Sequence, residues 1–108
     1  FKIIHCDEFQ TEGIDKIVER IRKRVGDNPL YLSIDIDVLD PAFAPGTGTP
    51  EIAGMTTREM VNVLRGLSGL NLVSADVVEV SPAYDHAEVT SLAAATIVYE
   101  LTNLFAKS

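Results

Sequence analysis

Asp35 and Asp37 are the residues whose type and spacing point most clearly to chemistry. They lie in an apolar segment, 30–39, that predicts a β-strand, and side chains two apart on a strand share a face. Their Cα atoms would lie roughly 6.6 Å apart, so that both carboxylates can reach one ligand. Two adjacent carboxylates on a buried parallel strand are costly unless they share protons or a cation compensates them, and a divalent metal is the simplest such cation.

The alternative for these two aspartates is an edge strand whose carboxylates simply face water. The segment that follows, 40–54, favours the metal site, because it carries three prolines and three glycines and has no helical or strand periodicity. Open α/β sheets bind ligands at the carboxyl ends of their strands, where this loop begins. Prolines reduce the entropy lost on ordering and glycines allow close backbone approach, so we expect a preorganised loop beside the carboxylates.

Glu79 is a second candidate, because it is an acid among valines at the carboxyl end of the predicted strand 71–80. A carboxylate held there can accept two parallel hydrogen bonds from a guanidinium group. A salt bridge to an arginine of this chain, or simple exposure at the strand end, explains it equally well. Asp76 is at most a supporting hydrogen-bond acceptor, and His5 and His86 are too weakly placed to assign.

The elements that must position these residues are predicted by periodicity and by capping signals. They are a strand over 1–6, a helix over 14–25, a strand over 30–39, a helix that begins after Thr56 and ends near 66–69, a strand over 71–80 and a helix over about 87–105. Thr56 and Glu59 form a predicted capping box, and Asp85 can cap the last helix. The order βαβαβα predicts an α/β fold of three layers, αβα, with a parallel sheet that belongs to a larger domain.

Composition limits the classes of function that remain. The chain has 108 residues, 46% hydrophobic residues and a net charge of −7, so it is an ordered domain without the basic surface of a nucleic-acid binder. No window approaches the uninterrupted apolar run of about 20 residues that a membrane span needs. Cys6 is the one cysteine, which favours a reducing compartment, and we expect it to pack in the core.

Two other classes share part of the pattern. A strand that ends in D-x-D is typical of haloacid-dehalogenase-type phosphohydrolases, but Val38 and Leu39 stand where that motif usually has threonine, and no phosphate-binding glycine loop opens a helix. A non-catalytic α/β module with an acidic edge would leave the proline–glycine loop unexplained.

Two segments closely resemble the ureohydrolase family, which includes arginase and agmatinase. They are residues 33–51, SIDIDVLDPAFAPGTGTPE, and residues 78–85, VEVSPAYD. The resemblance covers nearly the whole chain and implies that residues 1–108 are the carboxy-terminal third of one arginase-like domain, closer to agmatinases than to arginases. The Ile52-Ala53 pair departs from the family, where two glycines often follow the loop.

The resemblance implies a pair of Mn²⁺ ions and a metal-bridging hydroxide that attacks a guanidinium carbon and releases urea. Asp35 would bridge both metals and serve catalysis, Asp37 would bind one of them, and Glu79 would hold the guanidino substrate. Agmatine leads as substrate, ahead of guanidinobutyrate, arginine and proclavaminate-type compounds. The family's histidine-containing metal motifs are absent here, so we expect this chain alone to be inactive.

The family also implies a homo-oligomer, a trimer or hexamer, for the complete protein, with no nucleic-acid or membrane partner. We expect a cytoplasmic location, or a mitochondrial one if a targeting peptide precedes Phe1.

Overall fold

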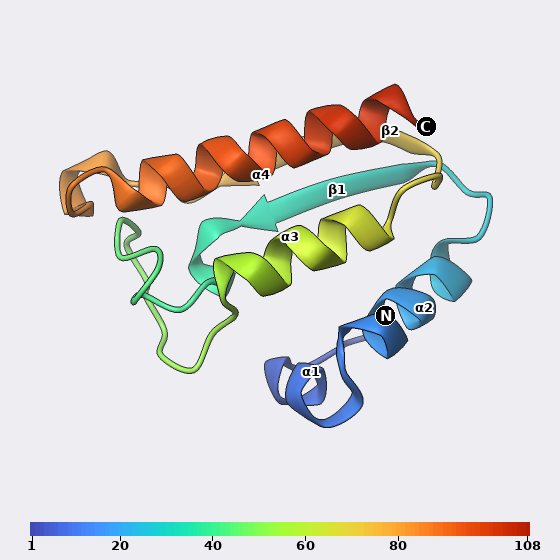
Figure 1. Cartoon of the computed structure of the whole chain (residues 1–108), viewed down its shortest axis with the longest axis horizontal. Coiled ribbons are helices and arrows are strands. Elements are labelled where there is room, and N and C mark those ends of the chain that lie inside the picture. The colour runs from blue at the N-terminus through green and yellow to red at the C-terminus, as the bar shows by residue number, and fades with distance from the viewer.

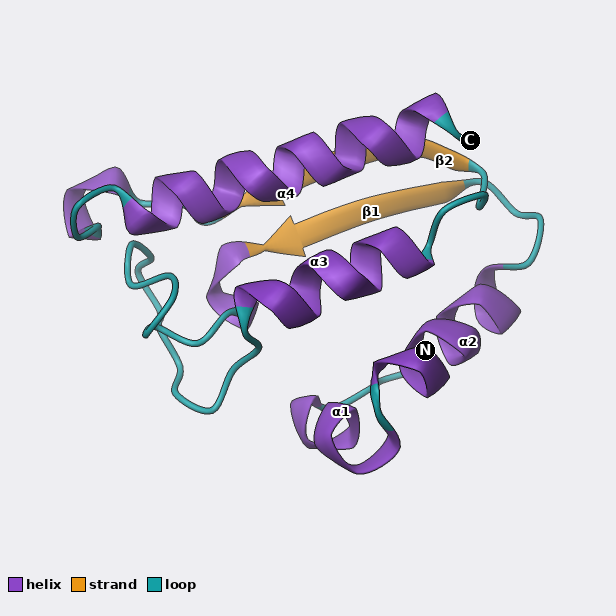
Figure 2. Ribbon diagram, in the orientation of Figure 1, coloured by secondary structure: helices purple, strands orange, loops and turns teal.

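The computed structural model describes all 108 residues. In it, long helices pack on a short parallel sheet (Figure 1). In chain order the elements are α1 (Cys6–Glu12), α2 (Ile14–Val25), β1 (Leu30–Asp35), α3 (Thr57–Gly66), β2 (Leu72–Val78) and α4 (Val89–Ala106). Short 3-10 turns, Ile36–Val38 and Pro82–Tyr84, come after β1 and β2 (Figure 2). Each strand therefore leads, through a loop at its carboxyl end, into a long helix.

β1 and β2 pair in parallel, with Tyr31 opposite Ser74 and Asp35 opposite Val78. Helix α3 connects them, as a parallel pair requires. The predicted α/β class with a parallel sheet is confirmed, as are the three longer helices within two residues at either end. The sheet has only these two strands, and the outer edge of each is unpaired.

The two faces of the strand pair differ in polarity. The side that packs against α3 and α4 is apolar and carries Leu30, Leu32, Ile34, Ala75 and Val77. The opposite side is polar, and there the hydroxyls of Tyr31 and Ser33 both donate to the carboxylate of Asp76. The chain thus forms two layers of the expected three, because none of its helices covers the polar face.

The strand predicted over residues 1–6 is wrong. Residues 1–5 lack regular structure and Cys6 opens α1, where the backbone N–H of His5 donates to Glu8 at 2.6 Å. A strand needs a neighbour that supplies its hydrogen bonds, whereas this capping bond is local and needs none. The predicted core position of Cys6 is also wrong, because its side chain is exposed.

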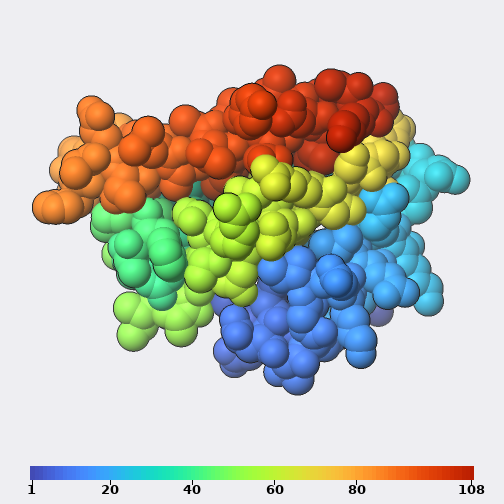
Figure 3. Space-filling view, in the orientation of Figure 1, coloured from blue at the N-terminus to red at the C-terminus, as the bar shows by residue number.

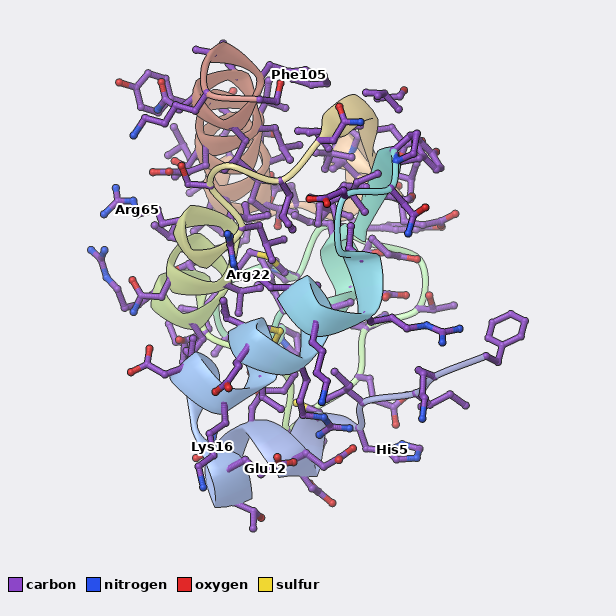
Figure 4. All side chains as sticks on the ribbon, turned by 90° about the vertical axis from the view of Figure 1, so that its right-hand side faces the viewer. His5, Glu12, Lys16, Arg22, Arg65 and Phe105 are labelled. Atoms are coloured by element: carbon purple, nitrogen blue, oxygen red, sulfur yellow. The ribbon has the colours of Figure 1, made fainter.

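Helices α2 and α3 approach closely where a glycine leaves room. The apolar stripe of α2 faces inward as predicted, with Ile17 fully buried, and a Cβ on Gly66 would lie 2.7 Å from the methyl groups of Val18. Arg22 of α2 reaches across this contact (Figure 4) and donates to the carbonyl oxygens of Gly66 and Ser68, at 3.0 and 2.8 Å. A guanidinium group at these free carbonyls stabilises the end of α3.

Helix α4 is long and apolar enough to cross a membrane by length and composition alone. In the structure it packs instead on β2 and α3, and it carries a buried acid, Glu100, which is 6% exposed. The guanidinium of Arg65 on α3 donates to both carboxylate oxygens of Glu100, the shortest bond being 2.8 Å. This ion pair fixes the contact between α3 and α4. Packing of α4 in the core is therefore a simpler explanation of its apolar composition than a membrane span.

Substitution Arg65→Met should lower the melting temperature by several degrees, because the carboxylate of Glu100 would stay buried without a donor. Thermal denaturation followed by circular dichroism measures the effect. Arg58→Met is the matched control, since Arg58 is exposed on the same helix and forms no ion pair. Equal melting temperatures for the two variants would show that the Arg65–Glu100 pair contributes nothing.

Candidate active site

The carboxyl end of β1 carries both predicted aspartates, but the strand stops at Asp35. Residues 36–38 form a 3-10 turn, so the alternation predicted to bring Asp35 and Asp37 together does not extend to Asp37. The turn brings them together instead, because the carboxylate of Asp35 accepts the backbone N–H of Asp37 at 3.1 Å. That bond caps the turn and ends the strand.

Asp37 is held from its other side by the loop predicted to be preorganised. The hydroxyl of Thr49 donates to the Asp37 carboxylate at 2.8 Å. At the base of the loop, the carboxylate of Asp40 accepts the backbone N–H groups of Ala42 and Ala53, at 2.9 and 3.0 Å. The loop therefore has a fixed path that ends on a candidate ligand, as the prolines and glycines predicted.

Glu79 lies next to these aspartates, at the carboxyl end of β2. Val78 is the register partner of Asp35, so Glu79 is one residue beyond the paired strands. Its φ of 69° is in the left-handed region, which costs a non-glycine residue about 1 kcal/mol or more and persists only where the surroundings enforce it. The side chain is exposed, and none of the chain's arginines or lysines forms an ion pair with it.

The electrostatics of this edge favour a cation. Burial, followed by the negative charges of Asp37 and Glu79, raises the pKa of the Asp35 carboxyl, although the backbone N–H of Asp37 opposes the rise. Carboxylate oxygens suit manganese and other hard divalent ions, so the donor set fits the expected metal. No three acidic, histidine or cysteine side chains of the 108 residues lie close enough to hold an ion by themselves.

A second fixed point of the loop lies at Gly46, against the start of α4. In Figure 3 the green atoms of this part of the chain lie against the orange atoms that lead into α4. The backbone N–H of Gly46 donates to the buried hydroxyl of Thr90, and its carbonyl accepts the N–H of Ser81, both at 2.7 Å. A Cβ on Gly46 would lie 2.9 Å from Thr90 Oγ1 and from the Cβ of Asp85. The sequence predicted no contact of Gly46 with Thr90 or Ser81, because no local pattern marks contacts between residues 44 and 35 positions apart.

The N-cap residue of α4 is Glu88 and the helix begins at Val89 rather than near Ala87, but the side chain of Asp85 still caps the first turn. Its carboxylate accepts the backbone N–H groups of Thr90 and Ser91, at 2.9 and 3.0 Å. Partial burial alone would raise the pKa of Asp85, but hydrogen bonds from Thr90, Ser91 and His86 outweigh it and hold the pKa well below its ordinary value. The start of α4 is therefore a firm support for the loop that contacts it.

The fold is that of a known class of α/β enzymes, the ureohydrolases. The chain belongs to the arginase family, whose model matches residues 1–103. It is 63% identical over its whole length to "Putative agmatinase 1" of Schizosaccharomyces pombe, and 52% identical over 96% of its length to the agmatinase of Photorhabdus laumondii. The crystal structure of proclavaminate amidino hydrolase from Streptomyces clavuligerus matches 98% of the chain with a TM-score of 0.96 and 46% identity.

The chain spans only part of these relatives. It covers 27% of the Schizosaccharomyces pombe protein, 34% of the Photorhabdus laumondii agmatinase and 35% of the Streptomyces clavuligerus structure. The family resemblance seen in the sequence is confirmed, and so is the arginase-like fold of these residues.

Substitution Gly46→Ala should destabilise the protein by about 1–3 kcal/mol, because the new Cβ has no room beside Thr90 and Asp85. Gly48→Ala is the matched control: nothing lies within 4 Å of its Cβ position. Chemical denaturation measures both. A Gly46→Ala variant as stable as Gly48→Ala would mean that the loop is free to move away from α4.

Proposed function

We propose that the protein to which these residues belong hydrolyses a guanidino compound to release urea, with agmatine as its preferred substrate. The observation that carries the proposal is the gathering of Asp35, Asp37 and Glu79 at one sheet edge of an arginase-family fold. Agmatine is preferred because relatives named agmatinases are 50–63% identical to the chain. Residues 1–108 would be the carboxy-terminal part of one arginase-like domain.

Asp35 and Asp37 would hold two manganese ions, with Asp35 shared between them. The ions, when bound, would lower the pKa of water and stabilise the charge that develops at the guanidinium carbon. The chain's own part is to keep two carboxylates adjacent and oriented, through the Asp37 N–H bond to Asp35 and the Thr49 hydroxyl bond to Asp37. The remaining ligands would come from outside these residues, so the chain alone would not turn over substrate.

Glu79 would bind the substrate guanidinium. A carboxylate and a guanidinium match in charge and in planar geometry, and two parallel N–H···O bonds orient the carbon that reacts. Glu79 is exposed and unpaired, so it is available for such a partner. Its place beside Asp35, on the neighbouring strand end, would present the guanidinium carbon to the metal-binding edge.

Other guanidino substrates are the second candidates. A guanidinopropionase of Pseudomonas aeruginosa is 52% identical over 99% of the chain. The proclavaminate amidino hydrolase structure, with a TM-score of 0.96, is as similar in fold as the structure of a hypothetical agmatinase from Burkholderia thailandensis, with 0.94. Relatives named for different guanidino substrates match nearly the whole chain, so the substrate's tail would be selected by other parts of the protein.

The full-length protein supplied with manganese should release urea, with agmatine giving the highest kcat/KM among agmatine, arginine, 4-guanidinobutyrate and 3-guanidinopropionate. A colorimetric urea assay over this panel measures it. Preference for another member would replace agmatine as substrate but keep the reaction. No urea from any of the four, with metal bound, would refute the proposal.

In the full-length protein, Asp35→Asn should weaken manganese binding and lower turnover by more than about 100-fold, because it removes a shared ligand charge.

Glu79→Gln should lower kcat/KM by roughly 30-fold or more and leave the metal content unchanged. Metal analysis and steady-state kinetics separate the two effects. The matched controls are Asp27→Asn and Glu19→Gln, exposed acids away from the sheet edge. Loss of metal from the Glu79→Gln variant would contradict the guanidinium role.

A further inference from the structure

Three segments that are distant in sequence meet at Gly46. Its N–H donates to the hydroxyl of Thr90 in the first turn of α4, and its carbonyl accepts the N–H of Ser81, which follows β2. Both bonds are 2.7 Å long, and the side chain of Thr90 is fully buried. We call these three residues the Gly46 junction.

The Gly46 junction lies between the two halves of the candidate site. Ser81 is two residues after Glu79, the proposed guanidinium ligand. Gly46 is three residues before Thr49, whose hydroxyl holds the carboxylate of Asp37. A short series of covalent and hydrogen bonds through the Gly46 junction therefore connects Glu79, the proposed guanidinium ligand, to Asp37, a proposed metal ligand.

Thr90 is the fixed end of that path. Its backbone N–H is bound by the Asp85 carboxylate at 2.9 Å, and α4 holds it against the core. If the Thr90 hydroxyl were removed, the N–H of Gly46 would be left without an acceptor. Because position 90 is buried, water has no ready access to replace that hydroxyl. A Cβ on Gly46 would lie 2.9 Å from both Thr90 Oγ1 and the Cβ of Asp85, so the backbone of Gly46 is closely packed against these two side chains.

Glu79 depends on this support more than its neighbours do. Its left-handed backbone, with φ at 69°, relaxes unless the chain on both sides is held. Pairing of β2 with β1 holds the residues before it, and the bond from Ser81 to Gly46 holds the residues after it.

We infer that Thr90 is a positioning residue for the guanidino hydrolysis proposed above. Its hydroxyl anchors Gly46, and Gly46 sets where Glu79 stands relative to Asp37. This inference rests on the proposed function for its effect on catalysis, whereas the anchoring itself can be measured without substrate.

The test compares three variants of the full-length protein. Thr90→Val keeps the shape and removes the acceptor, Thr90→Ser keeps the acceptor, and Thr102→Val makes the same change at an exposed threonine of the same helix. Thr90→Val should lower kcat about 10- to 100-fold, with KM changed less, because small misplacements of reacting groups have effects of this size. Thr90→Ser and Thr102→Val should remain within about threefold of wild type.

Two further readouts separate positioning from loss of structure. Hydrogen exchange should accelerate at the amide of Gly46 in Thr90→Val, and not at amides in the middle of α4. Manganese content per folded protein should equal that of wild type, because the Thr49 bond to Asp37 remains. If Thr90→Val does not fold, Thr90→Ala, which removes the same hydroxyl, takes its place.

Normal kcat in Thr90→Val, with or without faster exchange at Gly46, would overturn the inference, because Thr90 would then be at most structural. Equal losses in Thr90→Val and Thr90→Ser would also overturn it, since the acceptor is retained in serine. A wild-type protein without urea release would instead refute the proposed function, and the exchange experiment would still decide whether Thr90 anchors Gly46.

Discussion

Mutual repulsion among carboxylates at the carboxyl edge of the sheet is the constraint on which the rest of the structure depends. Asp35, Asp37 and Glu79 come from two adjacent strand ends, and burial together with the other two acids raises the pKa of Asp35. No basic side chain of the chain forms an ion pair with any of them. Such groups would separate if they were free to do so, and the backbone around them keeps them in place.

That restraint comes from hydrogen bonds to the backbone and from the loop, not from charge. The 3-10 turn ties Asp37 to Asp35, and the hydroxyl of Thr49 ties Asp37 to the loop. The loop is in turn closed at its base by Asp40 and fixed at its middle by Gly46. The carboxylates of this edge repel one another, and these bonds hold them in the positions that a positively charged ligand would need. Preorganisation of this kind raises the affinity of a site.

Features encoded by neighbouring residues could be predicted from the sequence, and features that need a distant partner could not. The stripe of α2 and the capping box of Thr56 and Glu59 are local, and both are confirmed. The apolar run over 1–6 predicted a strand, but a strand needs a partner that the pattern does not supply. The N–H of Asp37 donates to the Asp35 carboxylate and β1 ends at Asp35, so a turn, not the predicted strand alternation, brings the two aspartates together. Thr90 was missed because its role depends on a contact across 44 positions.

The close packing around Gly46 has a consequence for sequence variation among relatives. Because a Cβ there would meet both Asp85 and Thr90, position 46 cannot gain a side chain unless position 85 or 90 changes shape. The three positions should therefore vary together in an alignment of many arginase-family sequences. Family members with alanine or a larger residue at position 46 should have a different helix-capping residue at position 85.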